Sequence, residues 1–398
     1  MVTVILFILI LGLLVFVHEF GHFVVARRTG MKVYEFGLGF PPRALGVYRD
    51  PKTKKFVWVK SRGTRDEGRG TVTSTLKNTV GDGEGAEEFP ATLYSLNWLP
   101  LGGFCKIKGE NGDEANDPDS FGYQKAWKRI ATLVAGVSMN FLLAGFLLGF
   151  GLMWGLPADL SEGVDSHAII VEQPGVFIDQ VVNDSPAQKA GLQFGDKVEK
   201  IDGVQMKSSS EMVSYINGKN GQELTIDIKR GQENISIRAT PVVEKAGEPA
   251  RIGALLSDAG VIRYPWFIAL YKGFYAAGIG LINIFVAFYL LIKNLIIGQG
   301  LMFDVSGPVG IATVVGQSAK LGFNYLLNVT AMISLSLAAI NILPIPALDG
   351  GRVLFVLIEK VFRRPVPMKY EQLAHTIGFA LLMLLIVVVT FRDVVKLF

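Results

Sequence analysis

The five residues His18-Glu19-Phe20-Gly21-His22 follow an apolar run whose first 17 residues carry no charge. On a helix, positions i and i+4 lie on the same face, so His18 and His22 can present two imidazoles to one Zn²⁺ ion. Glu19 lies next to them, where its carboxylate can take a proton from a zinc-bound water. Ionisable side chains at membrane depth are costly unless they face the protein interior and have a function. The pattern therefore predicts a metalloprotease active site inside a membrane.

A catalytic zinc site usually has three protein ligands and one open position, so a third ligand is needed. Asp349 is one candidate, because it lies in the run NILPIPALDGG at residues 341–351. Two prolines end or kink a helix there, and two glycines permit sharp backbone turns, so the carboxylate can turn inward. Glu35 is the acidic residue that follows the histidine pair within a Gly-rich stretch. An N-cap role for Asp349 at a short helix over residues 352–362 is the competing interpretation.

The composition suits a polytopic membrane protein with a soluble portion. Half of the 398 residues are hydrophobic, and the mean hydropathy is +0.38. The single cysteine, Cys105, rules out an intramolecular disulfide framework. The chain has no basic helix, zinc finger or aromatic-basic array, so we expect no nucleic-acid partner. The N-terminal run lacks the positive start and small-residue cleavage site of a signal peptide.

Four segments are apolar and long enough to span a bilayer, which takes about 20 residues. They predict about four transmembrane helices, at residues 1–26, 129–157, 321–348 and 370–392. Between Arg27 and Lys77, within the loop at 27–128, 13 Lys and Arg residues stand against 4 acidic residues. The positive-inside rule places this loop in the cytoplasm. The active site would then lie toward the cytoplasmic side, with both termini outside.

A fifth apolar stretch at residues 266–297 belongs to a region that we predict, over 262–320, to be interfacial or re-entrant. A single crossing here would reverse the following helix and place Asp349 on the opposite face of the membrane from the histidine pair. Lys272, Asn283 and Asn294 recur every 11 residues, which is typical of a thin polar stripe on an interfacial helix. An ordinary fifth span is the alternative.

Two parts of the cytoplasmic loop, 33–46 and 93–108, have the composition of β-hairpin strands and predict a membrane-associated β-hairpin region. A Gly-rich, charged excursion at 52–88 separates them. Gly102 and Gly103 permit a tight turn or a close backbone approach. Strands next to a membrane active site can hold a substrate in an extended form by edge pairing. A purely structural hairpin is the alternative.

The run SPAQKAGLQFGDKVEKIDG at residues 185–203 resembles the PDZ domains of bacterial proteases. Segments 176–182, 224–228 and 235–239 around it alternate like strands. We therefore expect an inserted, extracytoplasmic PDZ domain of the α+β class at 170–246. Such domains bind extended peptides or chain ends by strand addition. A PDZ fold used only as a rigid spacer or gate is the alternative.

The combination of HEFGH in the first helix and NILPIPALDG in a late helix, with a PDZ-like region between them, resembles the site-2 protease family (peptidase family M50). The resemblance is strongest to its bacterial RseP-type members, which act in regulated intramembrane proteolysis, and it covers nearly the whole chain. It implies that His18, His22 and Asp349 ligate zinc and that Glu19 is the general base. The single PDZ-like region is a departure, because RseP-type relatives often have two.

The same resemblance implies supporting residues around the metal. Asn341 and Pro344 would shape the substrate site. The run AGVSMN at 135–140 is similar to the second-helix motif of the family, with Val137 where proline is common, and makes Asn140 an active-site residue. Hydrogen bonding between helices is the alternative role of Asn140 and Asn341.

These features together predict an intramembrane zinc endopeptidase of the bacterial cytoplasmic (inner) membrane. Its partners would be the lipid bilayer, single-span membrane proteins such as anti-sigma-factor-like regulators, and remnant signal peptides. A peptide or chain terminus at the PDZ domain is a further expected partner. A non-catalytic scaffold with structural zinc is the main rival. A transporter fits less well, because four spans without an internal repeat are unlike transporter folds.

Overall fold

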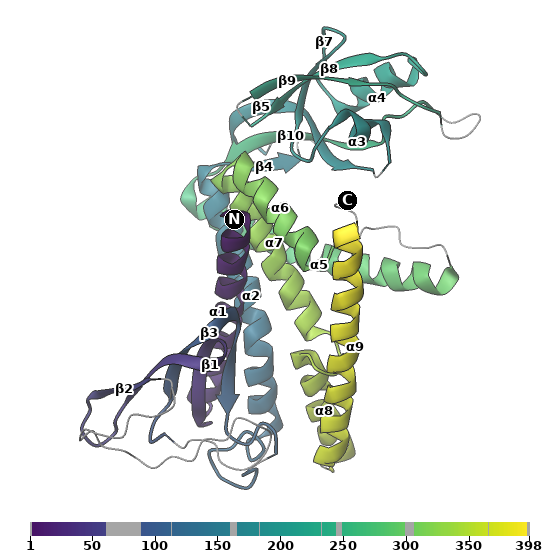
Figure 1. Cartoon of the computed structure of the whole chain (residues 1–398). Coiled ribbons are helices and arrows are strands. Elements are labelled where there is room, and N and C mark those ends of the chain that lie inside the picture. The colour runs from purple at the N-terminus through teal and green to yellow at the C-terminus, as the bar shows by residue number, and fades with distance from the viewer. Residues whose placement is uncertain are drawn as a thin grey trace.

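The computed structural model describes residues 2–60, 89–112, 114–159, 165–182, 184–231, 233–243, 249–298, 306–364 and 366–395. An upper domain of strands and short helices stands above a layer of long helices, and a small sheet lies beside the lower half of that layer (Figure 1). Helix α1 begins and helix α9 ends on the same side, next to the upper domain (Figure 1). The molecule therefore has two levels along its long axis, and the small sheet flanks the lower part of the helical level (Figure 1).

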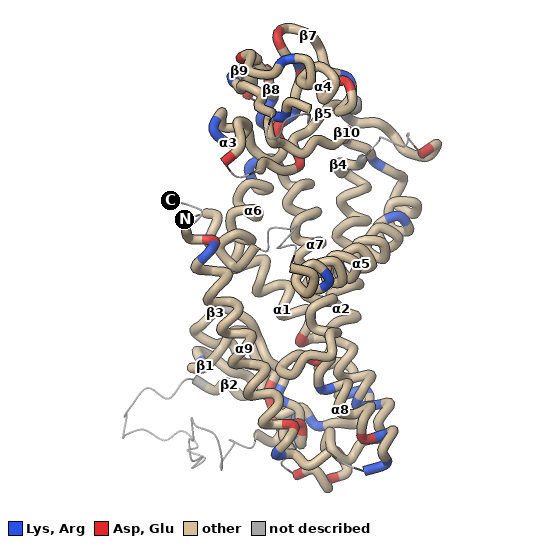
Figure 2. The backbone as a smooth tube through the Cα atoms, turned by 90° about the vertical axis from the view of Figure 1, so that its right-hand side faces the viewer, with Lys and Arg blue, Asp and Glu red and all other residues tan. Residues whose placement is uncertain are grey.

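Five helices in the described part of the chain are long and apolar enough to cross a membrane. They are α1 (Val2–Arg28), α2 (Ala126–Trp154), α5 (Trp266–Ile297), α7 (Phe323–Ile342) and α9 (Met368–Val395). Charged residues gather at the two ends of the molecule, and the helical middle is nearly free of them (Figure 2). This distribution is what a bilayer requires of a polytopic protein.

The helix bounds differ from the predicted ones where backbone geometry intervenes. The third predicted span, 321–348, is too long, because α7 ends at Ile342 and the prolines at 344 and 346 keep the following residues out of the helix. Likewise α2 ends at Trp154, and Leu156–Asp159 forms strand β4 after Gly155, whose φ is 122°. Helix α9 extends beyond the predicted 370–392 at both ends.

The lower sheet has three strands in the order β2-β1-β3, with β1 at Val33–Arg49, β2 at Phe56–Lys60 and β3 at Leu93–Ile107. Gly37 of β1 pairs with both Phe104 and Ser95, so β3 folds back on itself around β1. The predicted hairpin strands are therefore present and antiparallel. The predicted excursion contributes β2, and its residues 61–88 lie outside the described part of the chain.

The upper domain contains one antiparallel sheet in the order β4-β10-β5-β6-β8-β9, with β7 paired to β6. The bounds are β5 Ile169–Val181, α3 Pro186–Ala190, β6 Lys197–Ile201, β7 Val204–Gln205, α4 Ser209–Asn217, β8 Leu224–Arg230, β9 Glu233–Ala239 and β10 Ala254–Arg263. Its strands alternate buried and exposed residues, as in β8, and close over an apolar core. Because β10 pairs with β5 and β4, the domain continues to residue 263, past the predicted end at 246.

Two helices occupy the region predicted as interfacial. The first half of α5 packs closely on α2, where a β-carbon built on Gly273 would lie 2.3 Å from the backbone nitrogen of Gly149. The second half of α5 extends sideways, away from the other helices (Figures 1 and 2). Helix α6 (Pro308–Leu321) follows and packs against α1 and α7. The end of α6 contacts the upper domain, because Leu321 lies against Gly195.

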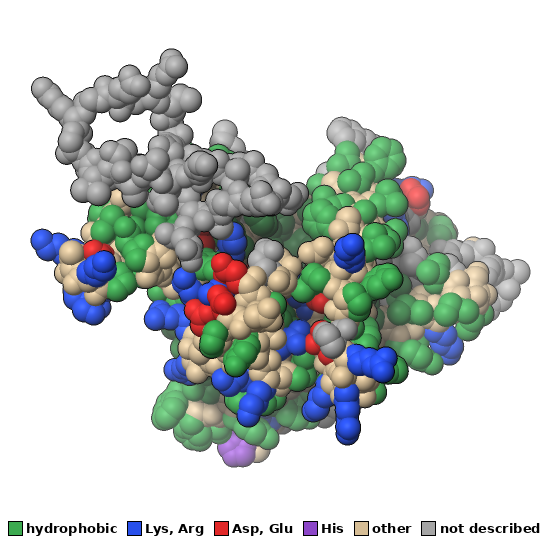
Figure 3. All heavy atoms as spheres, turned by 90° about the horizontal axis from the view of Figure 1, so that it is seen from below, with side chains coloured by type: hydrophobic (Ala, Val, Ile, Leu, Met, Phe, Trp, Pro, Cys, Tyr) green, Lys and Arg blue, Asp and Glu red, His purple; other side chains and the backbone are tan. Residues whose placement is uncertain are grey.

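The lower end of the molecule is rich in basic side chains. Arg27 and Arg28 occupy the last turn of α1, and Lys360 lies in the last turn of α8 (Asp349–Phe362). Seen from below, Lys and Arg side chains are spread over this end (Figure 3).

Candidate metal centre and active site

The histidine pair is held where α1 crosses α2 at very short range. Gly21 of α1 has no room for a side chain, because a β-carbon there would lie 2.4 Å from the carbonyl oxygen of Ala135. On the opposite side of this contact, a β-carbon on Gly136 would lie 2.5 Å from Nε2 of His22 and 2.7 Å from Nε2 of His18. The backbone of α2 therefore forms the floor under both imidazoles.

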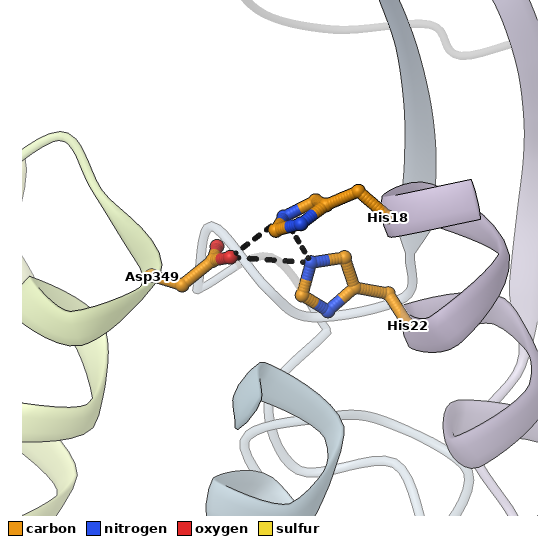
Figure 4. Close-up of side chains that lie close together, drawn as sticks. All are labelled: His18, His22 and Asp349. Carbon is orange, nitrogen blue, oxygen red and sulfur yellow. Dashed lines mark hydrogen bonds and ion pairs between the residues drawn. The ribbon is translucent and has the colours of Figure 1, made fainter. Parts of the chain in front are cut away.

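His18, His22 and Asp349 converge, although α1 and α8 lie at opposite ends of the sequence (Figure 4). The Oδ2 atom of Asp349 lies 2.9 Å from Nε2 of His18 and 3.3 Å from Nε2 of His22. The two Nε2 atoms are 3.2 Å apart. Of the described residues, these three form the group of potential metal ligands, with one ligand atom from each within 4.8 Å of the others.

These distances fit a zinc ion. Two donor atoms that each lie about 2.0–2.1 Å from a tetrahedral ion are about 3.3 Å apart. Nitrogen from His and oxygen from a carboxylate are both common zinc ligands, and three protein ligands leave one position open. The missing side chain at Gly136 leaves the space beside both Nε2 atoms clear.

Asp349 reaches this point because a short non-helical loop separates α7 from α8. A β-carbon on Gly350 would lie 2.3 Å from the carbonyl oxygens of Ile342 and Leu343, so only glycine allows the loop to fold against the start of α8. Helix α8 begins at Asp349 itself, its N-cap position is Leu348, and no side chain caps it. The N-cap interpretation of Asp349 is therefore wrong. The carboxylate points across to the histidine pair instead (Figure 4).

Glu35, the other acidic residue considered as a ligand, is engaged elsewhere. Its carboxylate accepts hydrogen bonds from the guanidinium of Arg43 within β1, with the shortest distance 3.1 Å. Glu35 is not part of the group of potential ligands.

Contacts behind the histidines set which ring nitrogen faces the centre. Nδ1 of His22 donates to the carbonyl oxygen of Thr132 at 2.8 Å, which leaves Nε2 as the nitrogen with a free lone pair. Nδ1 of His18 lies 3.3 Å from Nδ2 of Asn140, whose buried Oδ1 has no hydrogen-bond partner in the described part of the chain.

The two ends of an amide group have the same shape, so Asn140 can equally turn Oδ1 toward His18. Oδ1 then accepts from a protonated Nδ1, and Nε2 of His18 keeps its lone pair for a metal. The orphaned oxygen is satisfied in the same step. The chain's own hydrogen bonding thus fits a metal at this centre.

Glu19 lies between the histidine pair and the lower sheet. A β-carbon on Gly103 would lie 3.6 Å from Cγ of Glu19, so strand β3 passes this side chain with space for little more than a methyl group between them. Gly103 is packed against the carbonyl oxygen of Gly37, and Gly102 has a φ of 93°. The predicted close backbone approach at these glycines is confirmed, and it occurs inside β3.

The remaining predicted site residues lie at the end of α7 and on the loop that follows it. Asn341 is half-buried in the last turn of α7, and Pro344 is exposed just after that helix. Neither belongs to the group of potential ligands. Three features of the site were not predicted as functional: the floor at Gly136, the crossing at Gly21 and the carbonyl oxygen of Thr132. A glycine inside an apolar helix was the available signal for the first two, since it commonly marks close helix packing.

Sequence comparison identifies relatives over nearly the whole chain. Residues 6–56 and 86–385 match the profile of peptidase family M50. The regulator of sigma-W protease RasP of Bacillus subtilis is 30% identical over 441 residues, which cover 100% of this chain and 99% of that protein. The zinc metalloprotease RasP of Oceanobacillus iheyensis is 31% identical over 100% of both chains. Among solved structures, the PDZ domain of an SdrC-like protein from Listeria monocytogenes is 31% identical and covers 22% of this chain and 93% of that domain, with a TM-score of 0.20.

Proposed function

The chain belongs to peptidase family M50 and is a membrane zinc metalloprotease, and on this premise we propose which of its residues cut a peptide bond, and how. The observation that carries the proposal is the meeting of His18, His22 and Asp349 beside Glu19, at a depth where the surrounding helices are apolar. Ionisable groups in such a place are retained for function. We assign the first three side chains to zinc and Glu19 to proton transfer.

The chemistry of the site divides between the metal and the protein. A bound Zn²⁺ ion supplies a Lewis acid that polarises the scissile carbonyl and acidifies a water. The carboxylate of Glu19 takes the proton from the attacking water and then passes it to the nitrogen of the leaving amine. Asn140 and the carbonyl oxygen of Thr132 hold the two imidazoles in the tautomer that the ligand role needs.

A substrate helix must unwind before it can be cut, because a helix engages its own carbonyls in hydrogen bonds. Strand β3 is at the edge of the lower sheet and passes Glu19 at Gly103. We propose that an extended substrate segment pairs with β3 near Gly102 and Gly103, so that its scissile carbonyl lies over the metal centre. Asn341 and Pro344, at the end of α7, would border the same space.

The orientation and the upper domain are further parts of this proposal. The basic lower end, with Arg27, Arg28 and Lys360, would face the cytoplasm, and the upper domain and both termini would lie outside. The upper domain would be a PDZ domain that binds a peptide or chain end above the substrate entrance. Helix α5, which leaves the helical layer sideways, would lie along or dip into the membrane.

The substrate class follows from the position of the site. A centre at membrane depth, beneath a folded domain, would accept single-span segments whose external part is small. Anti-sigma-factor-like regulators and remnant signal peptides have this form. In a bacterium these substrates and the enzyme would share the cytoplasmic (inner) membrane. The name of the Bacillus subtilis relative, which refers to sigma-W, supports the first of these classes.

The test uses the full-length protein reconstituted in vesicles with a single-span reporter. Glu19→Gln should abolish cleavage, because the amide cannot accept the proton. It should keep the bound zinc, because Glu19 is not one of the proposed ligands. Asp349→Asn should lose both cleavage and most of the zinc. Equal processing by the parent protein and Glu19→Gln would refute the protease mechanism and favour a scaffold with structural zinc.

A further inference from the structure

The loop that delivers Asp349 contains one residue in an unusual backbone conformation. Ala347 has a φ of 78°, a left-handed value that residues with a β-carbon adopt rarely unless their surroundings hold them there. It lies two residues before Asp349, and α8 begins at Asp349 itself. A change in the backbone at Ala347 is therefore passed to the carboxylate through Leu348 alone.

Helix α9 holds this loop at two positions, His375 and Gly378. The backbone N–H of Ala347 donates a hydrogen bond to Nδ1 of His375 at 2.8 Å. On the same face of α9, a β-carbon on Gly378 would lie 2.4 Å from the carbonyl oxygen of Pro346. Helices α8 and α9 lie side by side at the lower end of the molecule, with the loop above them (Figure 1). The loop is thus fixed by two adjacent points of α9.

The hydrogen bond from Ala347 determines which nitrogen of the neutral His375 ring carries the proton. Because Nδ1 accepts a hydrogen bond, it has no proton, and the ring of neutral His375 bears its proton on Nε2. Nε2 is buried without a hydrogen-bond partner in the described part of the chain and lies 3.9 Å from Oε1 of Glu371. The side chain of His375 also lines a cavity of about 200 Å³ whose other lining residues include Arg352 and Glu110. Among the described residues, His375 therefore makes its one hydrogen bond to the loop, and its distance to Glu371 is longer than a hydrogen bond.

We propose that His375 is a positioning residue for the metal centre: its Nδ1 atom holds Ala347 in the left-handed conformation and so sets the position of the Asp349 carboxylate. This inference rests on the proposed role of Asp349 as a zinc ligand. Among the described residues, His375 makes no hydrogen bond or ion pair with the histidine pair, and α9 contacts the loop through His375 and Gly378.

The experiment compares three variants of the full-length protein by zinc affinity, measured by competition with a chelator and normalised to the folded fraction. His375→Asn keeps an acceptor close to the place of Nδ1, whereas His375→Leu has nearly the same shape as asparagine and no acceptor. We expect the leucine variant to bind zinc about 10- to 100-fold more weakly, because replacing a residue that positions a metal ligand commonly lowers the metal affinity by this factor. The asparagine variant should stay within about threefold of the parent protein.

His375→Gln is the third variant, since its amide reaches the place of Nε2 and leaves that of Nδ1 empty. His375→Gln should weaken zinc binding as much as His375→Leu does. If the leucine variant does not fold, the glutamine variant tests the positioning role of His375 in its place. Parental affinity in a folded leucine or glutamine variant, or an equal loss in the asparagine variant, would overturn the inference. Asp349→Asn is the reference variant. If Asp349→Asn binds zinc like the parent protein, the proposed ligand set is wrong. If Asp349→Asn loses zinc affinity and His375→Leu keeps it, only the positioning role of His375 is refuted.

Discussion

Replacing Gly136 by alanine is the smallest change that should disable the metal centre. The added methyl carbon would lie 2.5 Å from Nε2 of His22 and 2.7 Å from Nε2 of His18. Neither imidazole can simply retreat. His22 is tied through Nδ1 to the carbonyl oxygen of Thr132, and Nδ1 of His18 lies against the amide of Asn140.

The size of the effect follows from these distances. Ordinary van der Waals contact begins at 3.4 Å, so the gap to His22 must open by about 0.9 Å. Zinc ligands tolerate displacements of only about 0.2 Å before the coordination geometry is lost. We therefore expect Gly136→Ala to weaken zinc binding by at least about 100-fold, which corresponds to about 2.8 kcal/mol, and to abolish peptide-bond cleavage.

The assay measures zinc bound per protein and its competition by a chelator in the purified full-length enzyme. Gly278→Ala is the matched control, because a β-carbon at Gly278 in α5 would meet nothing within 4 Å. The control should keep parental zinc affinity and cleavage. If Gly136→Ala folds and binds zinc like the control, the floor under the histidines is not where the structure places it, and the reasoning fails.

Three further changes test other parts of the structure. Asn140→Leu should weaken zinc binding about 10- to 100-fold in a chelator competition, while Asn140→Asp, which can still accept from Nδ1 of His18, should not; equal losses would contradict this. Asp196→Ala removes a fully buried carboxylate that accepts hydrogen bonds from Arg230 at 2.6 and 2.7 Å. Calorimetry should therefore show the upper domain destabilised by about 3 kcal/mol. An unchanged melting temperature of that domain would contradict this. The hydrogen bond that Lys272 of α5 donates to the carboxylate of Asp165 lowers the pKa of Asp165 to about 2. Because the pKa of Asp165 is lowered, the contact between Lys272 and Asp165 is present at pH values above this pKa and is lost as the pH falls through it. A spin-label distance across the contact should therefore stay constant from pH 7 to 4. A change in that distance near pH 4 would refute the assignment.

The residues that we propose as metal ligands could be singled out from the sequence because their signals are local. The i, i+4 spacing of His18 and His22 fixes two ligands on one helix face wherever that helix lies. The prolines and glycines around Asp349, whose backbone restrictions act over a few residues, made it a candidate, and the family resemblance implied its role as a ligand. The structure adds that α8 begins at Asp349 and leaves its side chain free of capping.

The parts that were missed depend on contacts between distant segments. The acceptor from Thr132 is a backbone carbonyl, which every residue type has, so no sequence signal marks it. The end of the upper domain was placed too early because β10 pairs with β5 across a long separation, and strand pairing at that range leaves no local pattern. The contact of His375 with Ala347 was missed for the same reason.

The metal centre is divided between the two ends of the chain, and this has a consequence for how the enzyme is made. Helix α1 leaves the ribosome before α8, whose first residue is Asp349, and before α9. Until α8 and α9 follow, the histidine pair has two of its three ligands and lacks the loop clamped by α9. A chain whose synthesis has not yet reached α8 therefore lacks one of the three proposed zinc ligands. The distance along the sequence between the histidine pair and Asp349 thus delays the assembly of the centre until α8 and α9 are in place.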